Sequence, residues 1–159
     1  MIDYILNKLS KLYLKKTDVG KTVLFPAIEL EPTQIRTAKQ FLNFHEKTDN
    51  VALKSLLGFN PATTPWCAGF INAIEKKCGR EGTKKLLARS YLTYGEKTVF
   101  PIIGDIVVFS RGNSSWQGHV GYYIKQDKDN VLSLGGNQDD QVCYKYYSKN
   151  NVIGYRRPK

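Results

Sequence analysis

The spacing of hydrophobic residues changes near Gly104, and this change limits the fold of the chain more than any other feature. Before it, apolar residues such as Ile35, Ala38 and Leu42 recur at intervals of three or four, which is typical of amphipathic helices. After it, segments rich in Val, Ile and Tyr alternate with polar turns and predict strands at 104–109, 118–125, 130–135, 142–148 and 152–157. Helices followed by antiparallel strands indicate an α+β fold, in which N-terminal helices pack on a C-terminal sheet.

Several helices are expected in the first part of the chain. Residues 3–16 place apolar and basic side chains at helical spacing, which predicts an amphipathic helix that packs on the domain. Contact of this basic helix with a membrane surface is the less favoured interpretation. Further helices are expected at 33–47, with His45 exposed near its end, at 50–57, from residue 65 to about 78, and at 83–88. With 159 residues, the chain is long enough for one domain with a hydrophobic core.

The predicted helix that starts at residue 65 presents a cysteine near its beginning. Thr64 is a favourable N-cap and Pro65 suits the first helical position, which would make Cys67 the third helical residue. There the unpaired N–H groups and the helix dipole would stabilise a thiolate, the nucleophilic form of the side chain. A free cysteine is also a common small buried hydrophobic residue, so this pattern alone does not decide the role of Cys67. The helix would be buried through an apolar stripe of Trp66, Phe70, Ile71 and Ile74.

A histidine and an asparagine are expected to face one another in the sheet. A hairpin centred on Lys128 places His119 and Asn137, which are equidistant from it in sequence, directly opposite each other. Their Cβ atoms would then be about 5 Å apart. An asparagine there would hold one imidazole nitrogen, which leaves the other free to take a thiol proton. A cysteine at a helix start, a strand histidine and a polar side chain beside it are the parts of a thiol hydrolase.

Six sequence blocks, in this order, also resemble the CHAP and NlpC/P60 superfamily, especially its small phage endolysins: TPWCAGF (64–70), ARSY (88–91), GDIVVF (104–109), GHVGY (118–122), LGGNQ (134–138) and GYRRP (154–158). The resemblance covers residues 33–159 as a catalytic region and leaves 1–32 as an N-terminal extension. It implies a papain-like fold and peptidoglycan hydrolysis.

By the same resemblance, Cys67 corresponds to the nucleophile, His119 to the general base and Asn137 to the polar third member. The backbone N–H of Cys67 would help to bind the oxyanion. Many CHAP domains carry a glutamate where this chain has Gly135, so Gln138 or Asp139 could share the third role.

Charge and cysteine content narrow the choice of partners. The formal net charge of +10 implies an anionic partner, and we expect this to be bacterial peptidoglycan rather than nucleic acid, because no nucleic-acid-binding motif is present. Three cysteines without a CxxC pair and two histidines give no support for a metal site or a cofactor, although the pair Asp139 and Asp140 could attract calcium. We expect a monomer.

The sequence also suggests where the protein acts. The N-terminus does not match a secretory signal, and no apolar run is long enough to span a membrane. We therefore expect synthesis in the cytoplasm of a host bacterium and access to the wall through a holin or a secretion system. Two alternatives remain open: a delivered papain-like amidase or deamidase toxin, and a non-catalytic wall-binding module.

Overall fold

The structure is a computed structural model of the 159-residue chain, and it describes residues 12–16, 22–26 and 31–159. The chain divides into two compact units, Met1–Glu31 and Pro32–Lys159, which are described separately below. Within the described ranges, every helix is too short or too polar to cross a lipid bilayer.

The described part of the first unit is a two-stranded antiparallel hairpin. Strand β1 (Leu12–Lys16) pairs with β2 (Thr22–Pro26), and Leu14 lies opposite Leu24. The helix predicted at 3–16 is therefore wrong over its last five residues, which are extended and paired. Apolar and basic side chains at helical spacing gave the prediction, but five residues are too few to distinguish a helical from an extended period. Residues 3–11 of that prediction lie outside the described residues.

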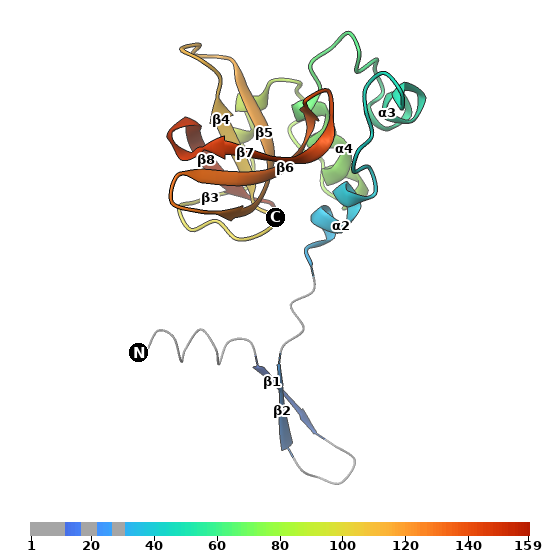
Figure 1. Cartoon of the computed structure of the whole chain (residues 1–159). Coiled ribbons are helices and arrows are strands. Elements are labelled where there is room, and N and C mark those ends of the chain that lie inside the picture. Colours follow the sequence, from blue (N-terminus) through green and yellow to red (C-terminus); the bar gives the residue numbers. More distant parts are fainter. Residues whose placement is uncertain (1–11, 17–21, 27–30) are drawn as a thin grey trace. The chain divides into compact units, whose positions relative to one another are not determined.

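The second unit begins with three helices (Figure 1). They are α2 (Thr33–Lys39), α3 (Asn50–Leu57) and α4 (Cys67–Lys77). The prediction at 50–57 is confirmed, and Gly58 ends α3 with the positive φ of 80° that glycine adopts readily. The helix predicted at 33–47 is shorter than expected, since it ends at Lys39, and His45 lies beyond it in a β-bridge with Gln141. The helix predicted at 83–88 is wrong, because residues 83–87 are irregular and a 3₁₀-helix, η1 (Ala88–Thr93), begins only at Ala88.

The remaining elements form one six-stranded antiparallel sheet with the order β3-β8-β4-β5-β6-β7. The predicted strands are all present, so the α+β fold is confirmed. Their bounds are β3 (Glu96–Thr98), β4 (Ile106–Ser110), β5 (Gly118–Gln126), β6 (Asn130–Gln138), β7 (Gln141–Ser148) and β8 (Val152–Arg157), with a short 3₁₀-helix η2 (Lys149–Asn151) before β8.

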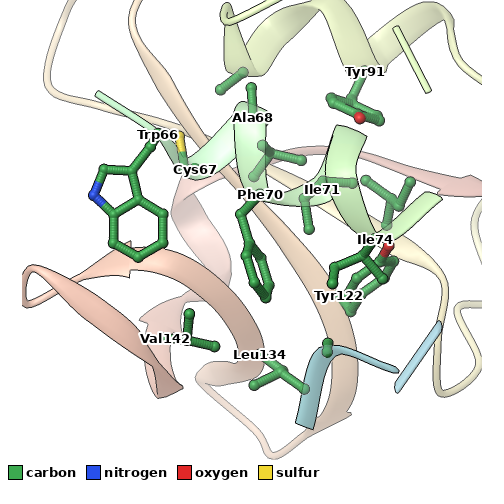
Figure 2. Close-up of a cluster of buried hydrophobic side chains, with 14 of the residues drawn as sticks. Trp66, Cys67, Ala68, Phe70, Ile71, Ile74, Tyr91, Tyr122, Leu134 and Val142 are labelled. Atoms are coloured by element: carbon green, nitrogen blue, oxygen red, sulfur yellow. The ribbon is translucent and has the colours of Figure 1, made fainter. Parts of the chain in front are cut away.

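The main core lies between α4 and one face of the sheet. The stripe of Trp66, Phe70, Ile71 and Ile74 is fully buried, as predicted. In Figure 2 these side chains point from α4 towards residues of the sheet that include Tyr122, Leu134 and Val142. This packing fixes the start of α4 against β5 and β6.

The opposite face of the sheet curls around a smaller core. Phe109 on β4 and Tyr147 on β7 have ring centroids 4.5 Å apart, although two strands separate β4 from β7 in the sheet order. Contact between such distant strands requires strong curvature. The curl brings side chains of β4, β5 and β7 together on its inner side.

Candidate active site

Cys67 is the first residue of α4 rather than the third. Trp66 occupies the N-cap position and makes no side-chain capping hydrogen bond, so the predicted roles of Thr64 and Pro65 are wrong. Trp66 is fully buried, and its indole N–H donates to a carboxylate oxygen of Glu46 at 3.0 Å. Burial of this large side chain outweighs the local preference of Thr64 for the N-cap.

The environment of Cys67 differs from the one expected at a helix start. Burial raises the pKa of the Cys67 thiol, while interactions with the backbone of Val120 and Ala68, and then the charge of Arg111, lower the pKa by smaller amounts. The side chain is 8 % exposed. The resting form at neutral pH is therefore a thiol, and a neighbouring base has to remove its proton for attack.

His119 lies on β5 and is held by Gln138. Nε2 of the imidazole is 2.9 Å from Oε1 of Gln138, and both side chains are buried. The amide nitrogen of Gln138 donates to the backbone carbonyl of Cys143, which turns Oε1 towards the histidine. Because Oε1 can only accept, this geometry places the imidazole proton on Nε2. Nδ1 of His119 is buried and has no hydrogen-bond partner in the described structure, so its lone pair can accept a proton.

The contact predicted between His119 and Asn137 is replaced by the hydrogen bond between His119 and Gln138. Next to the turn, Gln126 pairs with Val131 and is one residue out of the register predicted from a turn at Lys128. An irregularity between Tyr123 and Lys125 then restores the predicted register, in which Tyr122 pairs with Leu134. Beyond it, β6 contains a bulge between Gly135 and Gln138, and Asn137 has a positive φ of 56°. One extra residue reverses the alternation of side chains along a strand. Gln138 therefore takes the position that regular alternation assigns to Asn137.

The imidazole is also positioned by aromatic stacking. Tyr147 lies nearly parallel to His119, with ring centroids 4.9 Å apart and an angle of 24°, and Phe109 lies 6.1 Å away on the paired strand β4. Burial lowers the pKa of His119 to about 4, whereas the hydrogen bond to Gln138 raises it by a smaller amount. At neutral pH the histidine is therefore neutral and able to act as a base.

One cavity of about 240 Å³ connects these groups. Its lining includes Cys67, His119 and Asn137, so the structure brings the three predicted residues together around one space. The rest of the lining includes Leu86, Arg111 and the exposed Trp116. A substrate in this cavity would contact both the thiol and the imidazole.

Two structural carboxylates support the elements of the site. Glu75 of α4 is fully buried and accepts hydrogen bonds from the hydroxyls of Tyr122 and Tyr94, at 2.7 and 2.8 Å, and from Nε and Nη2 of Arg80, at 2.5 and 2.9 Å. This network joins α4 to β5, and the sequence interpretation missed it because a lone glutamate on a helix usually faces solvent. Asp105 accepts hydrogen bonds from the Ile102 N–H and from the guanidinium of Arg157 on β8.

Asp139 does not contact the imidazole through any hydrogen bond that the structure shows. Its carboxylate forms an ion pair with Lys145 instead. In the described part of the chain, no three His, Cys, Asp or Glu side chains gather as a metal site would require.

Comparisons with known proteins give little further information. No protein-family model matches the sequence, and no curated protein matches it. Among solved structures, a "NLPC/P60 family protein from Bacillus cereus ATCC 10987" has a TM-score of 0.49 and 18% sequence identity to this chain. The match covers 93% of this chain and 50% of that protein, so the chain spans about half the length of the structure that it matches.

Proposed function

We propose that this protein is a cysteine hydrolase that cleaves an amide bond in the peptide part of bacterial peptidoglycan. The observation that carries the proposal is the pairing of His119 with Gln138 beside Cys67. It leaves Nδ1 as the base of a neutral imidazole in the cavity that the thiol also lines. The sequence blocks that resemble the NlpC/P60 and CHAP superfamily support the choice of substrate.

In the proposed mechanism, Nδ1 of His119 takes the thiol proton as the sulfur of Cys67 attacks the carbonyl carbon of the amide. The backbone N–H of Cys67, at the start of α4, helps to stabilise the oxyanion. The imidazolium then donates its proton to the departing amine, and a thioester remains. His119 next removes a proton from water, which hydrolyses the thioester and releases the thiol. Gln138 holds the tautomer and the orientation of the ring throughout.

Digestion of purified peptidoglycan tests this proposal. The wild-type protein should release soluble fragments with new amino and carboxyl ends, as detected by mass spectrometry. Cys67→Ala and Cys67→Ser should lower the rate by at least about a thousandfold, because each removes the nucleophile. Cys78→Ser is the matched control, since Cys78 lies at the other end of α4, and it should retain activity. Circular dichroism should show that all variants are folded.

The outcomes separate the alternatives. Unchanged wall clearance by Cys67→Ala would refute the thiol mechanism. A wild-type protein that leaves the wall intact but hydrolyses or deamidates proteins in a Cys67-dependent manner would instead be an amidase or deamidase toxin. Binding to peptidoglycan without any product would indicate a non-catalytic wall-binding module.

A further inference from the structure

The cavity beside Cys67 contains a positive charge without a nearby negative partner. Arg111, which directly follows β4, lines this cavity together with Cys67 and His119. None of the described residues that line the cavity is an aspartate or a glutamate. No ion pair joins Arg111 to a carboxylate in the described part of the chain. Its guanidinium is therefore available to a ligand.

The loop that carries Arg111 is anchored to the rest of the domain. Arg89 of η1 donates from Nε to the carbonyl oxygen of Gln117 and from Nη2 to that of Ser114, both at 2.7 Å. The hydroxyl of Ser114 in turn accepts from the backbone N–H groups of Trp116 and Gln117. These bonds limit the freedom of the connection between β4 and β5, so Arg111 and Trp116 are presented at the cavity from a braced loop.

The charge of Arg111 reaches both reacting groups. It lowers the pKa of the Cys67 thiol and also the pKa of His119, in each case as a smaller cause beside burial. Both effects agree with the place of Arg111 in the cavity lining. A negative group on a substrate held by this guanidinium would consequently lie close to the bond under attack.

We propose that Arg111 is a specificity-determining residue that binds a substrate carboxylate adjacent to the scissile amide. Guanidinium groups suit this role because their planar fork can donate two parallel hydrogen bonds to one carboxylate. Trp116, which is 64% exposed, would provide an apolar surface beside the bound group. This inference rests on the proposed function, since it assigns a charge to the substrate of that same site.

Alkylation of Cys67 tests the inference without any wall substrate. Iodoacetate and iodoacetamide both transfer a two-carbon group to a thiolate, but only iodoacetate carries a carboxylate. In a given variant both reagents meet the same thiolate population, so the ratio of their rates isolates recognition of charge. Arg111→Gln should lower the iodoacetate-to-iodoacetamide ratio at Cys67 by about threefold to tenfold, and 1 M salt should weaken the wild-type preference.

Three comparisons control this measurement. Peptide mapping by mass spectrometry reads Cys67 and Cys78 in the same molecules, and the ratio at Cys78 should not change. Arg36→Gln removes an exposed arginine of α2 outside the cavity and should behave like the wild type. Arg111→Lys keeps the charge but loses the planar fork, so its ratio should lie between those of the wild type and Arg111→Gln. An unchanged ratio in Arg111→Gln would overturn the inference.

Hydrolysis provides a second readout. Two synthetic wall peptides that differ only in a carboxylate or a carboxamide beside the scissile bond should be distinguished by the wild type, and Arg111→Gln should lose this preference through KM. An equal loss of kcat on both peptides would show that Arg111 stabilises the transition state and would overturn the inference. If neither peptide nor intact wall is cleaved, the proposed function fails, while the alkylation ratio still decides the role of Arg111.

Discussion

Gln138 accepts a hydrogen bond from His119 across 2.9 Å, although the ladder between β5 and β6 ends earlier, at Tyr122 and Leu134. The bulge in β6 makes this contact, because its extra residue turns Gln138 towards the inner side of the curled sheet. The carbonyl of Cys143 holds the other end of the amide. The imidazole is thus fixed by a side chain whose own orientation is fixed by the backbone.

Gln138→Ala should therefore impair catalysis more than Asn137→Ala does. Without the amide, the imidazole can rotate and can carry its proton on the wrong nitrogen, so we expect kcat to fall by about 10- to 100-fold. Asn137→Ala should lower kcat by less than about fivefold, because Asn137 lines the cavity but does not hold the imidazole ring. Steady-state kinetics on a soluble wall peptide would measure both. A larger loss of kcat in Asn137→Ala than in Gln138→Ala would indicate that Asn137, not Gln138, orients the imidazole.

The sequence predicted which faces of the helices and strands are buried, but it did not predict where a strand contains a bulge. The strands and the buried stripe of α4 follow from periodicity, which reflects burial on one face. The bulge at Gly136 and Asn137 could not be placed in this way, since a run of small and polar residues fits a turn equally well. The only signal was Gly-Gly-Asn itself, a sequence that tolerates positive φ.

The start of α4 shows a second limit. Thr64 and Pro65 are locally suited to begin a helix, but capping contributes only about 1 kcal/mol. Burial of Trp66, with its indole bonded to Glu46, contributes more and sets the start at Cys67. Burial of Cys67 itself raises the pKa of the thiol, whereas the sequence pattern suggested a lowered pKa. Desolvation depends on tertiary neighbours, which local sequence does not reveal.

The depressed pKa of His119 predicts activity in mildly acidic solution. An ordinary histidine is half protonated at pH 6.5, whereas His119 stays neutral down to about pH 4. If the neutral imidazole is the base, the acidic limb of kcat/KM should lie near pH 4, and activity should persist at pH 5 to 6. A soluble peptide substrate avoids the changing charge of the wall. An acidic limb near pH 6.5 would show that the histidine is hydrated during turnover.

The same pKa shift predicts a loss of stability in acid. Above pH 6.5 both folded and unfolded chains hold His119 neutral, so this residue adds no pH dependence. Between pH 6.5 and about 4 the unfolded chain takes up a proton that the folded chain excludes, and the free energy of unfolding falls. Urea titrations at pH 7.5 and 5 should show this fall in the wild type and a smaller one in His119→Gln. If the free energy of unfolding fell by the same amount in both proteins between pH 7.5 and 5, this would contradict a buried neutral His119.

Glu75 should be important for stability rather than for chemistry. Glu75→Ala leaves the guanidinium of Arg80 without its carboxylate and removes the acceptor of two tyrosine hydroxyls. Breaking a buried pair from one side typically costs about 3 to 5 kcal/mol. Urea denaturation should show a loss of this size. Glu81→Gln is the control, since Glu81 is exposed and its ion pair with the exposed Lys84 is a surface pair, and it should leave the urea midpoint nearly unchanged.

Gly136 should be sensitive to the addition of a single methyl group, because its backbone packs against Trp66 and Phe70 at the start of α4. A Cβ at this position would lie 2.5 Å from Cζ3 of Trp66 and 2.7 Å from Cβ of Phe70. Relief of these contacts would move β6 away from α4, and therefore Gln138 away from its place beside His119. Gly136→Ala should lower stability by about 1 to 3 kcal/mol, as overpacking does, and should lower kcat/KM as well.

A double-mutant cycle with Trp66→Phe tests the cause of this effect. Phenylalanine removes the part of the indole that the new methyl group would strike, at its own cost in burial. If the clash is the cause, the double variant should be more stable than the sum of the two single changes by at least about 0.5 kcal/mol. Additive changes would mean that Gly136→Ala acts through the backbone of the bulge instead. In that case kcat/KM would not recover in the double variant, whereas relief of the clash should restore part of it.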